Sequence, residues 1–132
     1  MTRREGKLER ALSLLGPLEG RLMKPIWDGR VRQPFVVRDV LELTPDLAYT
    51  TVMTTLNRLA DKGLLQVTKM ASHQAHKYRA NGGVSEFLAA SGRAEVDRLV
   101  ERYGDAALAA FADRLDRLSP STREALRRVR SR

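Results

Sequence analysis

Residues 46–65, with the sequence DLAYTTVMTTLNRLADKGLL, decide the fold. If this stretch is helical, its apolar positions share one face: Ala48, Val52, Leu56 and Leu59, with Thr55 and Ala60 at the edges. The opposite face carries hydroxyls, an amide and charges: Thr50, Thr54, Asn57 and Asp61, flanked by Thr51 and Arg58. Such side chains suit DNA base edges and phosphates, although four threonines can also be ordinary surface residues. Gly63 is expected to end the helix after Lys62, whose charge suits the negative helix end.

The residues before this helix favour a helix-turn-helix. VVRDVLEL, residues 36–43, predicts a short helix with Val37, Val40 and Leu41 facing inward. Residues 43–47 then form a tight connection in which Pro45 breaks the helix and Asp46 is a candidate cap for the next one. In a helix-turn-helix, the second helix enters the major groove of DNA.

An earlier helix is predicted to begin at Pro17 and to end near Gly29. Its expected apolar positions are Leu18, Leu22, Met23, Ile26 and Trp27. A proline inside a helix removes a backbone hydrogen bond, so we expect a kink or an early end at Pro25. We interpret Trp27 as a core residue rather than a ligand-stacking one, because it lies on the apolar face.

Two strands are predicted after the recognition helix, at residues 64–69 and 75–80, around a turn at residues 71–74. The positions expected to alternate are Leu65, Val67, His76 and Tyr78. Lys69, Lys77 and Arg79 would make the flanks of this β wing positive and suitable for phosphates. His73 and His76 could form a metal pair, but with no cysteine and no nearby acid we expect a donor at the wing tip and a packed imidazole.

Residues 81–83, Asn-Gly-Gly, mark the expected domain boundary, and the composition beyond them is helical. We predict helices from Ser85 to about Tyr103, after the Gly104-Asp105 break, and from Ser119-Pro120 onward. These helices cannot easily bury their apolar positions alone, so we expect pairing with a second chain; folding back onto the first domain is the alternative. The predicted dimerisation residues are Phe87, Leu88, Val96, Leu99, Val100, Leu108, Phe111, Leu115 and Leu126.

Charge and composition point to a nucleic-acid partner. The net charge of +8 favours attraction to a polyanion, and residues 1–80 carry 14 basic against 8 acidic side chains. The 132 residues contain no cysteine, which excludes disulfides and thiolate metal sites. We find no signal-peptide pattern and no apolar run of spanning length, and therefore expect a cytoplasmic protein without membrane contact. Residues 1–15 fit a short basic helix or a frayed arm, and we expect the mobile end.

Five segments together resemble the penicillinase-repressor family of winged-helix regulators: LGPLEGRLMKPIWDG, VVRDVLEL, AYTTVMTTLNRLADKGLL, HKYRA and RLSPSTREALRR. The resemblance covers nearly all of residues 14–130 and is most specific between Tyr49 and Leu64. It implies a homodimeric repressor that binds a palindromic operator. Thr50, Thr51, Met53 and Thr54 match the family's groove-facing residues, and Arg58 matches its phosphate-binding arginine.

Four departures from the family pattern bear on contacts and regulation. Val36 stands where the family often has a serine or threonine helix cap, and the wing turn at residues 71–74 lacks the usual glycine and arginine. Members that control β-lactam resistance are cleaved at an Asn-Phe bond, whereas the comparable place here is Ala110-Phe111. Copper-responsive relatives use C-terminal cysteines, which this chain lacks.

The expected fold is mainly α with a small β wing: an arm or short helix at residues 1–15, a winged helix-turn-helix domain at 16–81, and a helical dimerisation segment at 82–132. The expected function is a transcriptional repressor that binds a palindromic operator in double-stranded DNA as a homodimer, without cofactor, metal or catalytic residues. A winged-helix module for a protein partner is the alternative. The expected DNA-binding residues are Tyr49, Thr50, Thr51, Met53, Thr54, Arg58, Lys62, Lys69, His73 and Lys77.

Overall fold

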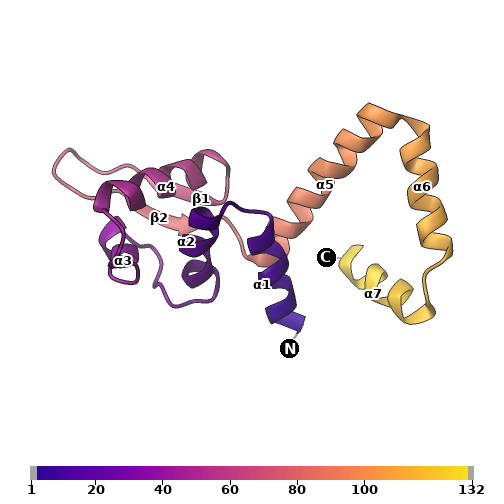
Figure 1. Cartoon of the computed structure of the whole chain (residues 1–132), viewed down its shortest axis with the longest axis horizontal. Helices are drawn as coiled ribbons and strands as arrows, with labels where there is room; N and C mark the ends of the chain where they lie inside the picture. Colours follow the sequence, from indigo (N-terminus) through magenta and orange to yellow (C-terminus); the bar gives the residue numbers. More distant parts are fainter. Residues whose placement is uncertain (1–2, 131–132) are drawn as a thin grey trace. The chain divides into compact units, whose positions relative to one another are not determined.

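The computed structural model describes residues 3–130, with side chains from residue 6 onward (Figure 1). The elements follow the order α1 (Arg3–Ser13), α2 (Pro17–Trp27), α3 (Val37–Leu41), α4 (Tyr49–Asp61), β1 (Leu65–Thr68), β2 (Lys77–Ala80), α5 (Val84–Tyr103), α6 (Asp105–Asp116) and α7 (Pro120–Arg130). The chain divides into two compact units, and the division falls within α5, between Ala89 and Ala90. The expected class, mainly α with a small β wing, is confirmed.

The core of the first unit lies where α2, α3 and α4 meet the wing. Val52, Leu56 and Leu59 of α4 are fully buried, as the apolar spacing predicts, and they share the core with Leu22 and Ile26 of α2. Val37 and Val40 of α3 are also buried in it. Ala48 departs from the prediction, because it is the exposed residue at which α4 is capped rather than part of the buried stripe.

Helix α2 continues through Pro25 to Trp27, so the alternative of an early end at the proline is wrong. Pro25 lies two residues before the last residue of α2, where a missing N–H removes only one hydrogen bond of the helix. Its carbonyl accepts hydrogen bonds from the N–H groups of Arg30 and Val31, at 3.0 and 3.3 Å. These bonds secure the turn that follows the helix.

The wing is a two-stranded antiparallel hairpin in which Val67 lies opposite Tyr78 and Leu65 opposite Ala80. Phe35 forms an isolated antiparallel β-bridge with Tyr78. The Phe35 N–H donates to the Tyr78 carbonyl at 2.9 Å, and the Tyr78 N–H donates to the Phe35 carbonyl at 2.8 Å. The Phe35 and Tyr78 rings stack with their centroids 5.8 Å apart. His76 was expected as a packed strand residue, but it is exposed in the loop before β2, where its Nδ1 accepts the N–H of Met70.

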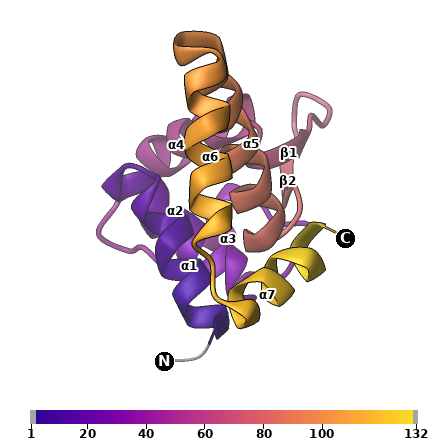
Figure 2. The same cartoon turned by 90° about the vertical axis from the view of Figure 1, so that its right-hand side faces the viewer.

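Residues 3–13 form a helix, so the expected mobile end is wrong for this stretch; the side chains of Arg3 and Arg4 lie outside the described residues. Helix α1 lies beside α2 (Figures 1 and 2). Ala11 is fully buried, and Leu12 packs where Gly20 of α2 leaves room for it. Ala11 and the half-buried Leu12 give α1 a contact with the rest of the unit, which stabilises a helix too short to be stable alone.

The second unit consists of the rest of α5 with α6 and α7. Gly104, with a φ of +63°, separates α5 from α6, and Ser119 accepts the N–H of Thr122 at the start of α7. Arg123 of α7 donates to the carbonyls of Leu115 and Asp116 at the end of α6, where carbonyls lack partners further along the helix. Within the described part of the chain, no helix combines the length and the hydropathy needed to span a bilayer.

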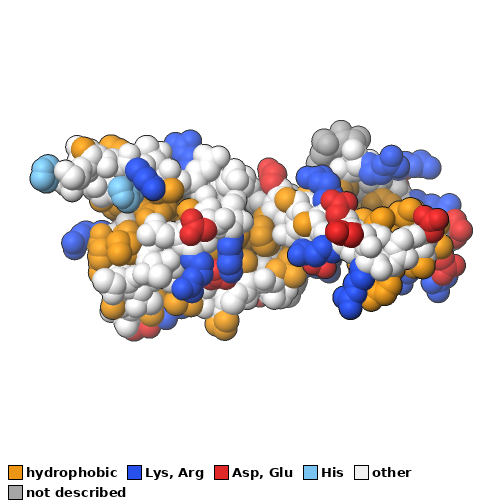
Figure 3. Space-filling view, turned by 90° about the horizontal axis from the view of Figure 1, so that it is seen from above, with side chains coloured by type: hydrophobic (Ala, Val, Ile, Leu, Met, Phe, Trp, Pro, Cys, Tyr) orange, Lys and Arg blue, Asp and Glu red, His pale blue; other side chains and the backbone are white. Residues whose placement is uncertain are grey.

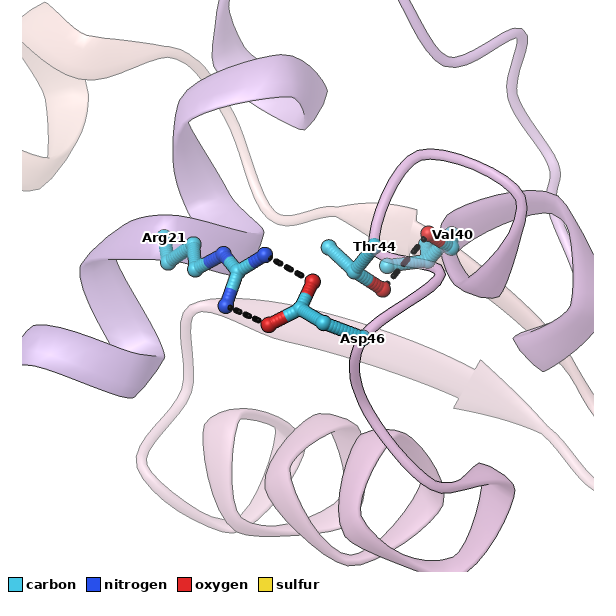
Figure 4. Close-up of polar contacts among 4 residues, drawn as sticks. All are labelled: Arg21, Val40, Thr44 and Asp46. Atoms are coloured by element: carbon cyan, nitrogen blue, oxygen red, sulfur yellow. Dashed lines mark hydrogen bonds and ion pairs between the residues drawn. The ribbon is translucent and has the colours of Figure 1, made fainter.

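The turn between α3 and α4 is held by two side-chain contacts (Figure 4). Thr44 is buried, and its hydroxyl donates to the Val40 carbonyl at the end of α3. Asp46 was expected to cap α4, but its carboxylate instead receives two hydrogen bonds from the Arg21 guanidinium of α2, one of them at 2.8 Å. The helix begins three residues later, and its N-cap is Ala48, which has no side-chain oxygen to accept a hydrogen bond.

We predict that Gly63→Ala lowers the free energy of unfolding by about 1–2 kcal/mol, because Gly63 ends α4 with a φ of +86°, where an L side chain is strained. Gly6→Ala is the matched control. Gly6 lies inside α1 with open space around it, so alanine there is expected to stabilise the helix by up to about 1 kcal/mol. Urea unfolding of both variants measures the difference, and equal stabilities would contradict the prediction.

We also predict a pH effect at Asp46. Hydrogen bonds from Arg21 lower the pKa of Asp46 below its ordinary value of 3.8. The pair therefore stabilises the fold above that value, and its contribution is lost as the pH falls through the lowered pKa. Arg21→Gln is expected to raise the pKa of Asp46 toward 3.8 in a carbon-detected NMR titration. Arg30→Gln, which removes a similar charge paired with Asp28, should leave the Asp46 titration unchanged; an identical shift in both variants would refute the assignment.

Candidate nucleic-acid interface

The solvent face of α4 carries the predicted hydroxyls and cation. Thr50, Thr54 and Arg58 are exposed, and their spacing of four residues places them in a row along one side of the helix. Thr51 and Met53 are half-buried at the two edges of this row, and Met53 packs against the core. Tyr49 at the first turn is 43% exposed. We call the row formed by Thr50, Thr54 and Arg58 the α4 face.

Two hydrogen bonds keep polar groups of α4 satisfied while its apolar stripe is buried. Thr55, expected at the edge of the stripe, is buried, and its hydroxyl donates to the Thr51 carbonyl at 2.8 Å. Asn57 lies beside the α4 face, and its amide oxygen accepts the hydroxyl of Tyr78 at 2.6 Å. Burial raises the pKa of Tyr78, and the nearby Tyr49 adds to the shift. The neutral Tyr78 hydroxyl therefore remains a donor that joins β2 to α4.

The predicted phosphate-binding cations divide into two groups. Arg58, Lys69 and Lys77 are exposed, and none of them forms an ion pair recorded among the described residues. Lys62 differs, because its ammonium lies 2.8 Å from Oε2 of Glu19 and donates to Oε1 at 3.0 Å. Glu19 is only 8% exposed, so Lys62 compensates a buried carboxylate. This contact gives Lys62 a partner within the fold.

The outer surface of the wing is hollowed and basic. A hollow of 430 Å³ lies over the hairpin. Its lining residues are Pro34, Gln66, Thr68, Met70, Lys77, Tyr78 and Arg79. Both histidines are exposed in the loop between the strands, where Figure 3 shows them in pale blue. Lys77 and Arg79 thus present positive charge on the outer surface of the wing, while His73 presents an imidazole at the loop.

Most of the predicted dimerisation residues lie in the second unit with little cover from the chain itself. Val96, Leu99, Leu108, Leu115 and Leu126 are each at least 37% exposed, and Val100 and Phe111 are half-buried. Among its described residues only Ala107 is buried, and Figure 3 shows orange apolar patches on this unit. Phe87 and Leu88 precede the division between the units, and Phe87 packs on Trp27 of α2 with ring centroids 5.2 Å apart. Phe87 therefore already has an apolar partner in the first unit.

Sequence reasoning missed Glu19 and Arg21 as partners of the helix-turn-helix. Both lie on α2, and they contact Lys62 and Asp46, which are 43 and 25 residues away in the chain. Periodicity does not reveal such pairs, because it reports only which face of a helix is apolar. The one available signal was Glu19 itself, an acid in the first turn of a helix that is otherwise largely buried.

The described residues, 3–130, give little support for a metal site. They contain no group of three or more His, Asp or Glu side chains placed to hold a metal ion. His73 and His76 belong to an exposed loop, and His76 already accepts a backbone N–H. What the first unit does present is a helix face of hydroxyls and a cation next to a basic hairpin, an arrangement suited to the phosphates and base edges of a duplex.

Comparison with known proteins shows the family of the chain. The family model described as "Penicillinase repressor" matches residues 15–132. The chain is 36% identical over 122 residues to "Transcriptional regulator BlaI" of Mycobacterium tuberculosis, in two strains, covering 89% of this chain and 83% of the relative. A solved structure of a MarR/EmrR family regulator from Acinetobacter sp. ADP1 matches with 12% identity and a TM-score of 0.44, covering 95% of this chain and 89% of that chain. The structure of the transcriptional regulator SlyA matches with 18% identity and a TM-score of 0.37, covering 94% and 92% of the two chains. The chain belongs to the penicillinase-repressor family of DNA-binding transcriptional regulators.

Proposed function

We propose that this protein is a repressor that binds a palindromic operator as a homodimer, with one α4 in each of two successive major grooves. The observation that carries the proposal is the α4 face, three exposed polar side chains in a row beside a basic wing. Thr50 and Thr54 offer hydroxyls and methyl groups to base edges, whereas Arg58 offers a charge to phosphate. Lys69, Lys77 and His73 extend these contacts along the flanking backbone.

Dimerisation is supported by the apolar surface of the second unit. Leu99 of α5, Leu108 of α6 and Leu126 of α7 remain exposed in the single chain. Large exposed apolar patches are typical of protein interfaces, and closed two-fold symmetry is the commonest way for identical chains to bury them. A two-fold dimer presents two recognition helices, which is the arrangement that a palindromic site requires.

The first experiment is quantitative binding to DNA from upstream of the protein's own gene, compared with random DNA of equal length over a salt series. We expect at least a thousand-fold preference, on the order of the specificity ratios of sequence-specific regulators, with two-fold symmetric protection. Equal and weak binding to both DNAs would reject that operator. Selection of duplexes from a random pool would then separate a regulator with a distant operator from a module that binds a protein.

Arg58→Ala and Thr54→Ala are expected to fail in different ways. Loss of the Arg58 charge removes a phosphate contact, so affinity should fall on every sequence and the slope of log K against log salt should flatten by about one. Loss of the Thr54 side chain removes a contact to a base, so we expect specific binding to weaken by about 1 kcal/mol with little change on random DNA.

Arg93→Ala is the matched control for charge, because Arg93 is exposed on α5 in the second unit and is not one of the predicted DNA-binding residues. Its salt slope is expected to match the unmodified protein. Fluorescence anisotropy on specific and random duplexes at five salt concentrations provides all the comparisons. Identical losses on both duplexes for Arg58→Ala and Thr54→Ala would contradict the assigned roles.

Leu99→Glu is expected to dissociate the dimer, because it places a charge within the apolar surface that the second chain covers. Ala94→Glu is the control on the same helix: Ala94 is exposed and lies five residues earlier, on the opposite side of α5. Sedimentation velocity should show a monomer for Leu99→Glu and a dimer for Ala94→Glu. Two dimers of equal stability would remove Leu99 from the interface.

A further inference from the structure

Helix α4 is bracketed by two ion pairs that both originate on α2. Arg21 binds Asp46, three residues before α4 begins, and Glu19 binds Lys62, the residue after α4 ends. We call these the two flanking ion pairs. A helix of 13 residues is about 20 Å long, so the two pairs hold α4 near its opposite ends.

The placement of Glu19 and Arg21 on α2 makes this possible. Residues two apart on a helix point about 200° apart, so the two side chains leave α2 on opposite sides. Between them, Leu22 and Ile26 of α2 enter the core that also holds Leu56 of α4. This packing fixes which face of α4 is buried. The ion pairs add a contact with a fixed partner near each end of the helix, which resists sliding or tilting of α4 over that core.

The polarity of the two flanking ion pairs is opposite. At the start of α4 the cation is on α2 and the acid precedes the recognition helix, whereas at its end the acid is on α2 and the cation follows the helix. Sliding α4 along α2 would separate both pairs. The Glu19 carboxylate is buried, so loss of Lys62 would also leave a charge without compensation.

We propose that Glu19 and Arg21 are positioning residues for operator recognition: through Lys62 and Asp46 they set the orientation of α4 on the first unit, and thereby the angle at which Thr50 and Thr54 meet the bases. The inference rests on the proposed function. It also reassigns Lys62, which acts through Glu19 rather than by binding a phosphate. Non-specific binding needs only the charges, so misorientation of α4 lowers specific affinity far more than random affinity.

Charge exchange tests the exposed pair without a risk to the core. Arg21→Glu and Asp46→Arg are each expected to lower the ratio of specific to random affinity about ten-fold, the effect of one mismatched base pair. The double variant R21E/D46R restores the pair with the original net charge, and its ratio should return to within about three-fold of the unmodified value. The probe is a duplex selected from a random pool by the unmodified protein, and the ratio cancels the general effect of added or removed charge.

The second pair is tested in the same way with K62E and E19K/K62E, and with Glu19→Gln as a variant of nearly equal volume. If Lys62 binds phosphate directly, E19K/K62E stays weak on both DNAs; restored binding assigns Lys62 to Glu19. Circular dichroism and thermal unfolding identify variants that fail to fold. The exposed pair then decides the proposal even if the Glu19 variants unfold.

The control is the exposed pair between Asp113 of α6 and Arg117, the residue after α6; it has the same charges and lies in the second unit. D113R and R117D should leave the affinity ratio unchanged. If folded R21E and D46R variants keep the unmodified ratio, or if the double variant restores nothing, the positioning role is wrong while the repressor proposal stands. If the unmodified protein selects no duplex at all, the proposed function fails first.

Discussion

The burial of one stripe of α4 is the constraint on which the rest of the first unit depends. Val52, Leu56 and Leu59 are removed from water completely, and this fixes which side of α4 remains available to a partner. Burial of each such side chain is worth about 1.5–3 kcal/mol, more than any exposed ion pair of the unit can contribute. The hydroxyls of Thr50 and Thr54 are therefore presented to solvent as a consequence of packing beneath them.

Features that repeat within a few residues could be predicted from the sequence. The apolar period of α4, the glycine at its end, the hairpin and the three later helices are local patterns, and each is found within a few residues of its expected position. Gly104 and Pro120 mark the later helix boundaries because their backbone requirements are local as well.

Features that depend on residues distant in the sequence could not be predicted. Asp46 resembles a cap until Arg21 is placed beside it, and Lys62 resembles a phosphate ligand until Glu19 is found beneath it. The charged stretch before Ser13 fits either a helix or a frayed arm, and contact with α2 accounts for the helix that is found. The roles of the α4 face in DNA binding and of Leu99 in dimerisation remain predictions.

The contact between Trp27 and Phe87 can be monitored by intrinsic tryptophan fluorescence. Trp27 is the only tryptophan in the chain, and the ring that it meets belongs to the first turn of α5. Indole emission depends on the polarity and the aromatic neighbours of the ring. The fluorescence of the unlabelled protein therefore changes when the contact between Trp27 and Phe87 changes. The attachment of α5 to α2 can thus be followed in real time while DNA is added, without altering a single residue.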